Sequence, residues 1–221
     1  MPKSYVIRSG RFTPAQRKAC DTLAENFVIP FSDETPDYNK IFKTENNNVN
    51  IIMEIGFGSG FATAEIAQAN PDKNYLGVEV HRPGIGRLLR EIKERNLSNI
   101  RIIEYDAAYV AQKMIHPGSL DGIHLFFPDP WPKKRHHKRR LIQRPFTEVL
   151  ADCLKQGGYL YMVTDWEDYA ICALEELTAT ANLHNAYEKF APPQTWRPLT
   201  RFEQKGIAKD HVIREIYFVK K

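Results

Sequence analysis

The sequence predicts an α/β protein with a doubly wound, mostly parallel sheet of seven strands. Three observations support this. Short runs of β-branched and aromatic residues alternate with helix-like segments from about residue 49 onward, and such alternation is typical of parallel sheets with helices on both faces. The 221 residues are enough for one sizeable core. Residues 1–48 lack the alternation and end in the polar run TENNNVN, so we expect a partly flexible N-terminal extension before one domain over residues 49–221.

Seven segments have the length and composition of strands, with turn residues at their ends. In chain order they are residues 50–54, 74–79, 100–105, 120–127, 159–164, 186–190 and 212–219. The first five alternate with helices, which predicts parallel pairing. The last two follow one another directly and are expected to pair as neighbours.

Five segments have helical periodicity: residues 60–70, 84–96, 107–115, 144–155 and 168–181. In residues 84–96 the apolar side chains share one face, with arginines and glutamates opposite. Gly157–Gly158 is expected to end the helix over residues 144–155. Because ligands of doubly wound sheets bind at the carboxyl ends of the strands, functional residues are expected just after each strand.

The composition argues against several classes of protein. Charged residues at 26%, hydrophobic residues at 43% and a net charge of +4 are ordinary for a soluble globular chain. The cysteines, Cys20, Cys153 and Cys172, are too widely spaced to suggest a disulfide framework or a cysteine-based zinc site. The N-terminal region shows no apolar signal segment, and no window approaches the roughly 20 apolar residues of a membrane span. We therefore expect a cytoplasmic protein with no metal and no membrane contact.

The first predicted strand runs into Glu54-Ile-Gly56-Phe-Gly58-Ser-Gly60. Glycines at this point permit a tight turn and let a ligand approach the backbone closely. The dinucleotide-binding pattern G-x-G-x-x-G would need a third glycine where Phe61 stands, and a P-loop would need a lysine after the glycines. The turn therefore argues against both of these nucleotide sites.

Acidic residues follow the next two strands. Glu79, a little over twenty residues beyond the glycines, is placed to accept hydrogen bonds from ribose hydroxyls. Asp106 can reach an adenine amino group, and the small Ala107 beside it leaves room for the ring. Each acid alone could equally be an ordinary solvated loop residue. Their repetition at successive strand ends, beside a glycine turn, favours a nucleoside-containing ligand.

This arrangement resembles the cofactor site of Rossmann-like S-adenosylmethionine-dependent methyltransferases. The resemblance implies a cofactor site formed by Glu54, Gly56, Gly58, Gly60, Glu79, Asp106 and Ala107. In that class the glycine loop passes the methionine part, Glu79 would hold the ribose, and Asp106 would hold the adenine. Carboxylates suit this ligand because its sulfonium and its amino group are both cationic.

The fourth predicted strand runs into FFPDPWPKKRHHKRR, residues 126–140. This stretch closely resembles the tRNA (guanine-N7)-methyltransferases. The resemblance extends to Thr164-Asp165, to Thr200-Arg201-Phe202-Glu203, and at the N-terminus to Arg8-Ser9-Gly10-Arg11 and Thr13-Pro14-x-Gln16. It covers most of the chain, and the combination of motifs is far more specific than the glycine turn alone.

The resemblance implies an enzyme that transfers a methyl group from S-adenosylmethionine to N7 of a guanine in the tRNA variable loop, forming 7-methylguanosine. N7 carries a lone pair and no proton, so the step needs in-line positioning and a fixed negative charge rather than a general base. Asp129, whose backbone is restricted by prolines on both sides, is the expected catalytic residue and also borders the cofactor. The residues expected to bind the guanine are Lys133, Asp165, Thr200, Arg201, Phe202 and Glu203.

The basic block after the tryptophan is expected to bind tRNA phosphates through salt-dependent contacts. Its members are Arg135, His136, His137, Lys138, Arg139 and Arg140. The two histidines lack the accompanying cysteines or carboxylates of a metal site. From the residues alone, simpler interpretations stay open: a rigid Pro-Asp-Pro-Trp turn anchored by Trp131, a solvated basic face or nuclear localisation signal, and a cap over residues 200–203.

Two other functions also stay open on the sequence. One is a methyltransferase that acts on another RNA or on a protein, which competition with tRNA would reveal. The other is a non-catalytic RNA-binding module with the same fold, which would fail to bind S-adenosylmethionine. The oligomeric state is left open between a monomer and a homodimer.

Overall fold

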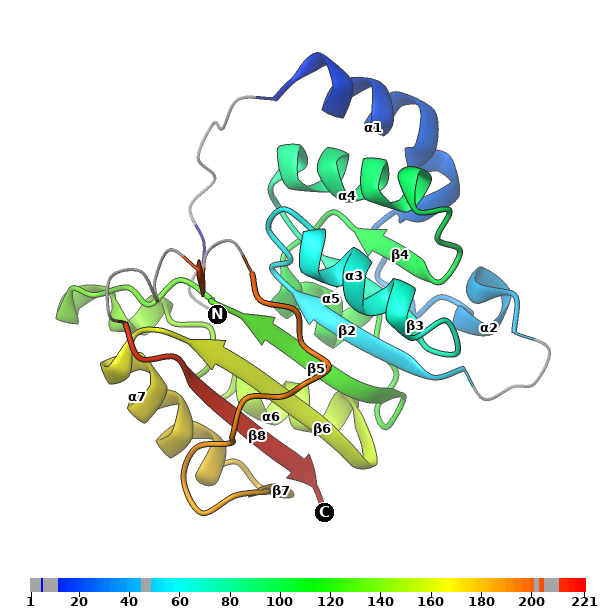
Figure 1. The fold of residues 1–221 in the computed structure, drawn as a ribbon. Coiled ribbons are helices and arrows are strands. Elements are labelled where there is room, and N and C mark those ends of the chain that lie inside the picture. Colours follow the sequence, from blue (N-terminus) through cyan, green and yellow to red (C-terminus); the bar gives the residue numbers. More distant parts are fainter. Residues whose placement is uncertain (1–4, 6–11, 45–48, 201–202, 205–210) are drawn as a thin grey trace. The chain divides into compact units, whose positions relative to one another are not determined.

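The computed structural model describes residue 5 and residues 12–44, 49–200, 203–204 and 211–221 (Figure 1). Within these residues the chain forms two compact units. The N-terminal unit comprises the described parts of Ile7–His116 with Trp196–Pro198. The C-terminal unit comprises those of Met1–Val6, Pro117–Thr195 and Leu199–Lys221.

Parallel strands form the sheet of the N-terminal unit, in the order β1-β4-β3-β2. They are β1 (Val28–Ile29), β2 (Ile51–Ile55), β3 (Asn74–Val78) and β4 (Ile100–Ile103). Every residue of β2 is buried, as is usual for parallel strands covered on both faces. The strands β2, β3 and β4 confirm the predictions. The sequence does not predict β1, because a strand of two residues shows no periodicity.

The helices described in this unit are α1 (Pro14–Phe27), α2 (Tyr38–Phe42), α3 (Phe61–Ala69), α4 (Arg82–Glu94) and α5 (Ala107–Lys113). In Figure 1, α3 and α4 cover one face of β2–β4, and α5 lies on the other face. The apolar face predicted for α4 is confirmed, because Ile85, Leu88, Leu89 and Ile92 are at most 2% exposed. This burial holds α4 in place beside the glycine turn.

Helix α1 packs against α4 and starts with a reciprocal cap. The backbone N–H of Thr13 donates to Gln16 Oε1 at 2.8 Å, the backbone N–H of Gln16 donates to Thr13 Oγ1 at 3.3 Å, and Pro14 occupies the first turn. The Thr13-Pro14-x-Gln16 motif thus has a local structural role as a capping box. The wider expectation of a partly flexible extension over residues 1–48 stays a prediction, and residues 8–11 lie outside the described chain.

In the C-terminal unit the strand order is β5-β6-β8-β7, with β5 and β6 parallel and β8 antiparallel to both neighbours. The strands are β5 (Leu120–Phe126), β6 (Leu154–Thr164), β7 (Leu183–Asn185) and β8 (Arg214–Lys220). The helices are the 3₁₀-helix η1 (Lys134–Arg139), α6 (Phe146–Cys153) and α7 (Glu167–Thr178). In Figure 1, α6 and α7 lie on the same face of β5, β6 and β8.

Two local predictions in this unit are wrong. The helix predicted over residues 144–155 ends at Cys153, and Gly157–Gly158 lies inside β6, which begins at Leu154. The strand predicted over residues 186–190 lies instead at β7, because Asn185 closes a turn: its Nδ2 donates to the Lys189 carbonyl at 2.8 Å. The described residues contain eight strands rather than seven, the additional one being β1.

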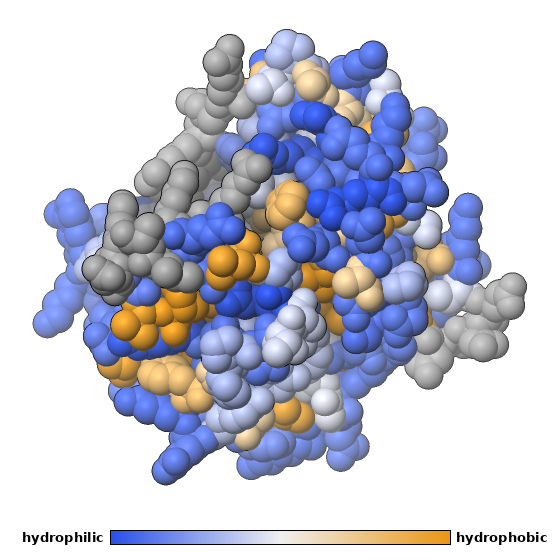
Figure 2. All heavy atoms as spheres, in the orientation of Figure 1, coloured by the Kyte–Doolittle hydropathy of each residue, from blue (hydrophilic) through white to orange (hydrophobic). Residues whose placement is uncertain are grey.

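The predicted α/β class with mostly parallel strands is confirmed, and β8 pairs antiparallel with both of its neighbours. Figure 2 shows one face of the surface, on which hydrophilic side chains predominate and apolar ones form small patches. In the described chain, no helix combines the length and the apolar character that crossing a membrane requires.

Candidate functional site

The glycine turn after β2 adopts a conformation that favours glycine. Gly56, Gly58 and Gly60 have φ angles of 74°, 56° and 69°, in the left-handed region. A Cβ on Gly56 or Gly58 would meet no described atom within 4 Å, so the backbone angle, not lack of space, requires glycine there. At Gly60 a Cβ would lie 2.6 Å from the Cβ of Leu88 on α4. The turn therefore presents open backbone at its first two glycines.

Glu79, directly after β3, is bonded to this turn. Its Oε2 accepts a hydrogen bond from the backbone N–H of Gly58 at 2.9 Å. Its Oε1 accepts from the N–H groups of Val80 and His81 at 2.7 and 3.0 Å. Helix α4 adds a contact that has no signal in the sequence, because a Cβ on Gly84 would collide with the Gly58 carbonyl oxygen. Glu79 and Gly84 thus order the turn on which a ligand would lie.

Glu54 is a buried carboxyl on β2, and it is 2% exposed. Its Oε2 accepts no hydrogen bond from any described residue. Burial raises the pKa of this carboxyl to about 7, because the charged form is poorly solvated. A buried oxygen without a donor costs about 1–3 kcal/mol, so it is suited to a ligand that supplies a cationic donor.

Asp106 starts α5 as its N-cap, and its Oδ1 accepts from the backbone N–H of Ala108 at 2.8 Å. Ala107 is the first residue of the helix. The preceding Tyr105 is 40% exposed and stacks on Phe31, with ring centroids 3.8 Å apart. This aromatic pair beside Asp106 is not singled out by the sequence, because Phe31 is distant in the chain and belongs to no motif.

In the C-terminal unit, Asp129 follows β5 on a constrained turn. Phe127 and Trp131, on either side of Pro128-Asp129-Pro130, have φ angles of 51° and 47°. Positive φ is costly for bulky residues and persists only where surrounding contacts enforce it. Asp129 itself is exposed, and no described residue forms a hydrogen bond or ion pair with its carboxylate. The turn thus holds an uncommitted acid at the end of the strand.

Trp131 packs against the basic block rather than into the core. Its ring lies edge-on to that of His136 at 5.9 Å, and the Arg139 guanidinium sits over it at 5.0 Å from the centroid. Trp131 is half-buried, which disfavours the alternative of a core anchor. The contacts instead join the turn to η1 through an edge-on ring and a cation–π pair.

The basic block forms η1 and the residues around it. Arg135 and Lys138 of the block are exposed, as are Lys133 and Lys134 directly before it. Desolvation and the nearby Arg135, Arg139, Lys133 and Lys138 lower the pKa of His136, which favours the neutral imidazole at pH 7. Arg140 departs from the predicted RNA-binding set, because it is only 2% exposed and its guanidinium is bonded inside the protein.

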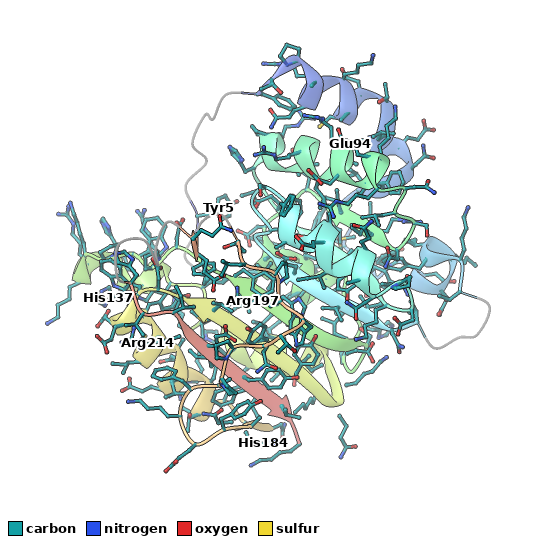
Figure 3. All side chains as sticks on the ribbon, viewed as in Figure 1. Tyr5, Glu94, His137, His184, Arg197 and Arg214 are labelled. Atoms are coloured by element: carbon teal, nitrogen blue, oxygen red, sulfur yellow. The ribbon has the colours of Figure 1, made fainter. Side chains whose placement is uncertain are left out.

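Asp165 follows β6, and its Oδ2 accepts a hydrogen bond from His211 Nδ1 at 2.9 Å. His211 is a partner that sequence patterns do not reveal. Thr164 lies opposite Arg214 in the ladder between β6 and β8. Figure 3 shows Arg214 and His137 of η1 at the same end of this unit, with His184 of β7 at the other end. Asp165 and the basic block therefore occur at one end of the unit.

Thr200 and Glu203 form a second reciprocal cap. The N–H of Glu203 donates to Thr200 Oγ1 at 3.1 Å, and the N–H of Thr200 donates to Glu203 Oε2 at 3.3 Å. The interpretation of this segment as a cap is therefore correct for these two residues. Arg201 and Phe202 lie outside the described residues, and the binding of guanine by this segment stays a prediction.

Known proteins resemble this chain along almost its whole length. The family model described as "Putative methyltransferase" matches residues 48–216. A tRNA (guanine-N(7)-)-methyltransferase of Paraburkholderia xenovorans (strain LB400) is 50% identical over 219 residues, which are 99% of this chain and 83% of the relative. One of Nitrosomonas eutropha (strain DSM 101675 / C91 / Nm57) is 50% identical over 218 residues, 99% of this chain and 96% of the relative.

Solved structures agree on the fold. The crystal structure of the 16S rRNA methyltransferase KamB matches with a TM-score of 0.60 over 85% of this chain and 95% of that chain. The sequence identity of that pair is 12%, so the match concerns the fold alone. It supports the α/β arrangement derived above from the strand order.

Proposed function

Because this chain belongs to the tRNA (guanine-N(7)-)-methyltransferase family, we propose that it transfers a methyl group to N7 of a guanine in tRNA. The observation that carries the proposal is the 50% identity to such enzymes over 99% of the chain. The product is 7-methylguanosine, and the target is a guanine of the variable loop. We place the reaction in the cytoplasm. The enzyme would act as a monomer or as a homodimer.

S-adenosylmethionine is the proposed methyl donor, and it supplies an electrophilic methyl group on a sulfonium. The N-terminal unit offers groups that suit it. The buried Oε2 of Glu54 accepts no hydrogen bond from the described residues and can accept from the amino group of the ligand. Gly56 and Gly58, which follow Glu54 in the turn, are exposed and have positive φ angles, so a ligand can approach their backbone. Glu79 and Asp106 each keep lone pairs beyond the amide bonds described above, for ribose and adenine.

Asp129 is proposed to act on the guanine. Positive charge appears on the purine ring as N7 gains the methyl group, and a carboxylate held beside the ring stabilises that charge. Asp129 can also accept hydrogen bonds from N1–H and the amino group, which fixes the base for in-line attack. No proton leaves N7, so Asp129 orients and stabilises rather than removing a proton. Asp165 and Glu203 are proposed to complete the recognition of the base.

The exposed cations of the basic block are proposed to hold the tRNA backbone. Arg135 and Lys138 of the block, with Lys134 just before it, can release counterions from phosphates, which gives salt-dependent affinity with little sequence preference. Lys133 is proposed to contact the guanine. Selection of one guanine would then rest on a base unstacked from its neighbours and recognised by Asp129 and Asp165.

The test is to incubate unmodified tRNA with methyl-labelled S-adenosylmethionine and to map the labelled atom. We expect label at guanine N7 in the variable loop. Label on another base atom would contradict the assignment. Transfer to a protein or another RNA that tRNA fails to compete away would favour a different substrate. Absence of S-adenosylmethionine binding in calorimetry would favour a non-catalytic RNA-binding module.

A further inference from the structure

One residue of the basic block differs from its exposed neighbours. The side chain of Arg140 is 2% exposed, although it directly follows η1. Burying a guanidinium is costly unless its charge is paired and its N–H groups are bonded. A phosphate of bound tRNA could not reach it without rearrangement. The bonds that Arg140 makes inside the protein therefore indicate its role.

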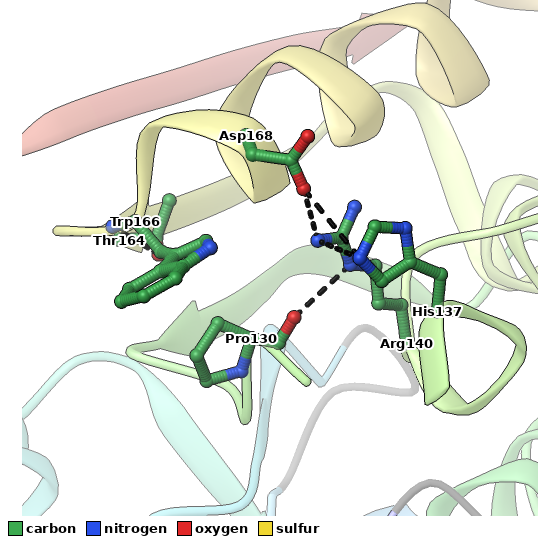
Figure 4. Close-up of polar contacts among 6 residues, drawn as sticks. All are labelled: Pro130, His137, Arg140, Thr164, Trp166 and Asp168. Carbon is green, nitrogen blue, oxygen red and sulfur yellow. Dashed lines mark hydrogen bonds and ion pairs between the residues drawn. The ribbon is translucent and has the colours of Figure 1, made fainter. Parts of the chain in front are cut away.

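Arg140 joins two segments of the C-terminal unit (Figure 4). Its Nε donates to the Pro130 carbonyl oxygen at 3.0 Å. Its Nη2 donates to Asp168 on the first turn of α7 and to His137 Nε2, the latter at 3.1 Å. The guanidinium hydrogen bond to Asp168 lowers the pKa of that carboxyl, so the pair stays charged at neutral pH. A planar guanidinium presents its N–H donors in a fixed fork, whereas an ammonium is a compact charge on a flexible stem.

A buried tyrosine fixes the backbone beside this arginine. Tyr169 of α7 is 0% exposed, and the guanidinium of Arg140 sits over its ring at 5.1 Å from the centroid. The Tyr169 hydroxyl accepts from the backbone N–H groups of Leu141 and Ile142, each at 3.1 Å. Arg140 is thus held from α7 both through its side chain and through the residues that follow it.

The two joined segments carry Asp129 and Asp165, two of the three carboxylates proposed to contact the guanine. The Pro130 carbonyl belongs to the residue directly after Asp129, within the turn bounded by the positive-φ residues Phe127 and Trp131. Asp168 lies three residues after Asp165, where β6 leads into α7. A single buried charge therefore bridges the turn with Asp129 and the junction with Asp165.

We propose that Arg140, paired with Asp168, is a positioning residue that sets the spacing between Asp129 and Asp165. The proposal rests on the proposed function, in which both carboxylates contact the guanine. Arg140 contacts neither the base nor the phosphates. Its effect on the reaction is indirect and appears in the rate of methyl transfer rather than in tRNA affinity.

Two substitutions test this, Asp168→Asn and Arg140→Lys. The matched control is Glu176→Gln, which removes another α7 carboxylate paired with an arginine, Arg144, at 3.1 Å and away from the turn. We expect both test variants to lower the single-turnover rate of methyl transfer at saturating tRNA and cofactor by roughly 10- to 100-fold, the size of a misplacement of about 1 Å. The tRNA Kd should stay within about twofold of wild type, and Glu176→Gln should keep the wild-type rate.

A measurement that needs no activity accompanies the rates. Hydrogen exchange of the peptide covering residues 126–133 should be faster in Asp168→Asn and Arg140→Lys, and unchanged in Glu176→Gln. Unchanged exchange and rate in both test variants would overturn the proposal. So would a loss of tRNA affinity with a shallower salt dependence in Arg140→Lys, since that would make Arg140 a phosphate contact. The rate assay measures label in any atom of the tRNA, so it does not depend on which atom is methylated. An error in the guanine-N7 assignment would appear in the base mapping instead.

Discussion

Asp129 and Glu79 are both acids that follow a parallel strand, yet they differ in exposure and in hydrogen bonding. Glu79 accepts hydrogen bonds from three backbone N–H groups and orders the glycine turn. Asp129 is exposed and has no described hydrogen-bond partner. A residue committed to backbone groups contributes to folding, whereas an uncommitted acid on a constrained turn is available to a substrate. Substitution should therefore separate the two roles.

We predict that Asp129→Ala lowers the rate of methyl transfer at least about 100-fold, because charge stabilisation in the transition state is lost. The melting temperature and the affinity for S-adenosylmethionine should stay near wild type. Kinetics with saturating tRNA and calorimetry with the cofactor measure these quantities. Glu79→Gln is the contrasting variant, and we expect it to lose about 1–3 kcal/mol of stability in urea, since a buried acceptor is removed. Wild-type activity in Asp129→Ala would contradict the proposed role.

Glu54 makes the apo protein sensitive to pH. Its pKa rises from 4.5 to about 7 on folding, so the folded state binds more protons than the unfolded state between these values. Stability should therefore fall as pH rises from about 4.5 to about 7, and level off above that. Urea unfolding across this range measures the slope, and Glu54→Gln should flatten it. An identical slope in Glu54→Gln would exclude this carboxyl as the source.

The same group should couple cofactor binding to protons. A cationic amino group favours ionised Glu54, so S-adenosylmethionine affinity should increase as pH rises toward about 7, the pKa of Glu54 in the free protein. Calorimetry in buffers of different ionisation enthalpy should then detect proton release below pH 7. Glu54→Gln should abolish the release.

At the level of elements, periodicity predicts the helices and strands whose pattern is visible in the local sequence. The buried face of α4 and the strands β2 to β5 follow from it, because alternating or helical spacing is visible in a short window. β1 and β7 do not, because a two-residue strand and a strand ended by the Asn185 turn leave no such pattern. Contacts between elements are equally hidden. Nothing near Gly86 in the sequence indicates that α1 lies against it.

The same limit applies to the candidate site. Motif spacing identifies Glu54, Glu79 and Asp129 at strand ends, since strand ends are predictable. It groups Arg140 with the exposed cations, because a run of basic letters does not show which side chain turns inward. The partner Asp168 is 28 residues away and His211 is 46 residues from Asp165, so only the folded chain reveals these pairs.

Substitution of Gly86 tests the packing of α1 against α4. A Cβ there would lie 2.7 Å from the Gln16 carbonyl oxygen and 2.9 Å from its Cβ. Alanine is favoured over glycine inside a helix by about 1 kcal/mol, so an isolated α4 would gain stability from Gly86→Ala. We predict the opposite sign in the protein, a loss of about 1–3 kcal/mol, because α1 is displaced from α4.

Urea unfolding gives the sign for Gly86→Ala, and limited proteolysis within Pro14–Phe27 reports on α1. Arg87→Ala, an exposed change at the next position of α4, is the control and should alter stability little. A stabilised Gly86→Ala with unchanged proteolysis would mean that α1 does not pack as described.

At the level of the whole molecule, charge placement matters more than net charge. The chain carries a formal net charge of only +4. Exposed cations are nevertheless concentrated around η1, where Lys133, Lys134, Arg135 and Lys138 lie close in sequence. Such a local patch attracts a polyanion even on a nearly balanced protein. The long-range attraction of tRNA is therefore expected to depend on this patch and on ionic strength.

We predict that Lys134→Ala combined with Lys138→Ala weakens tRNA binding. The plot of log Kobs against log salt concentration should become less steep by roughly 1.5–2, about one unit for each lost phosphate contact. Substituting these two exposed lysines tests the effect of charge. Substituting Arg139 would also remove its contact with the ring of Trp131. Lys189→Ala, an exposed lysine of the same unit outside the block, is the control and should keep the wild-type slope. Binding measured at several salt concentrations decides the matter. A double variant with the wild-type slope would show that phosphates are bound elsewhere, and the block would then be a solvated face.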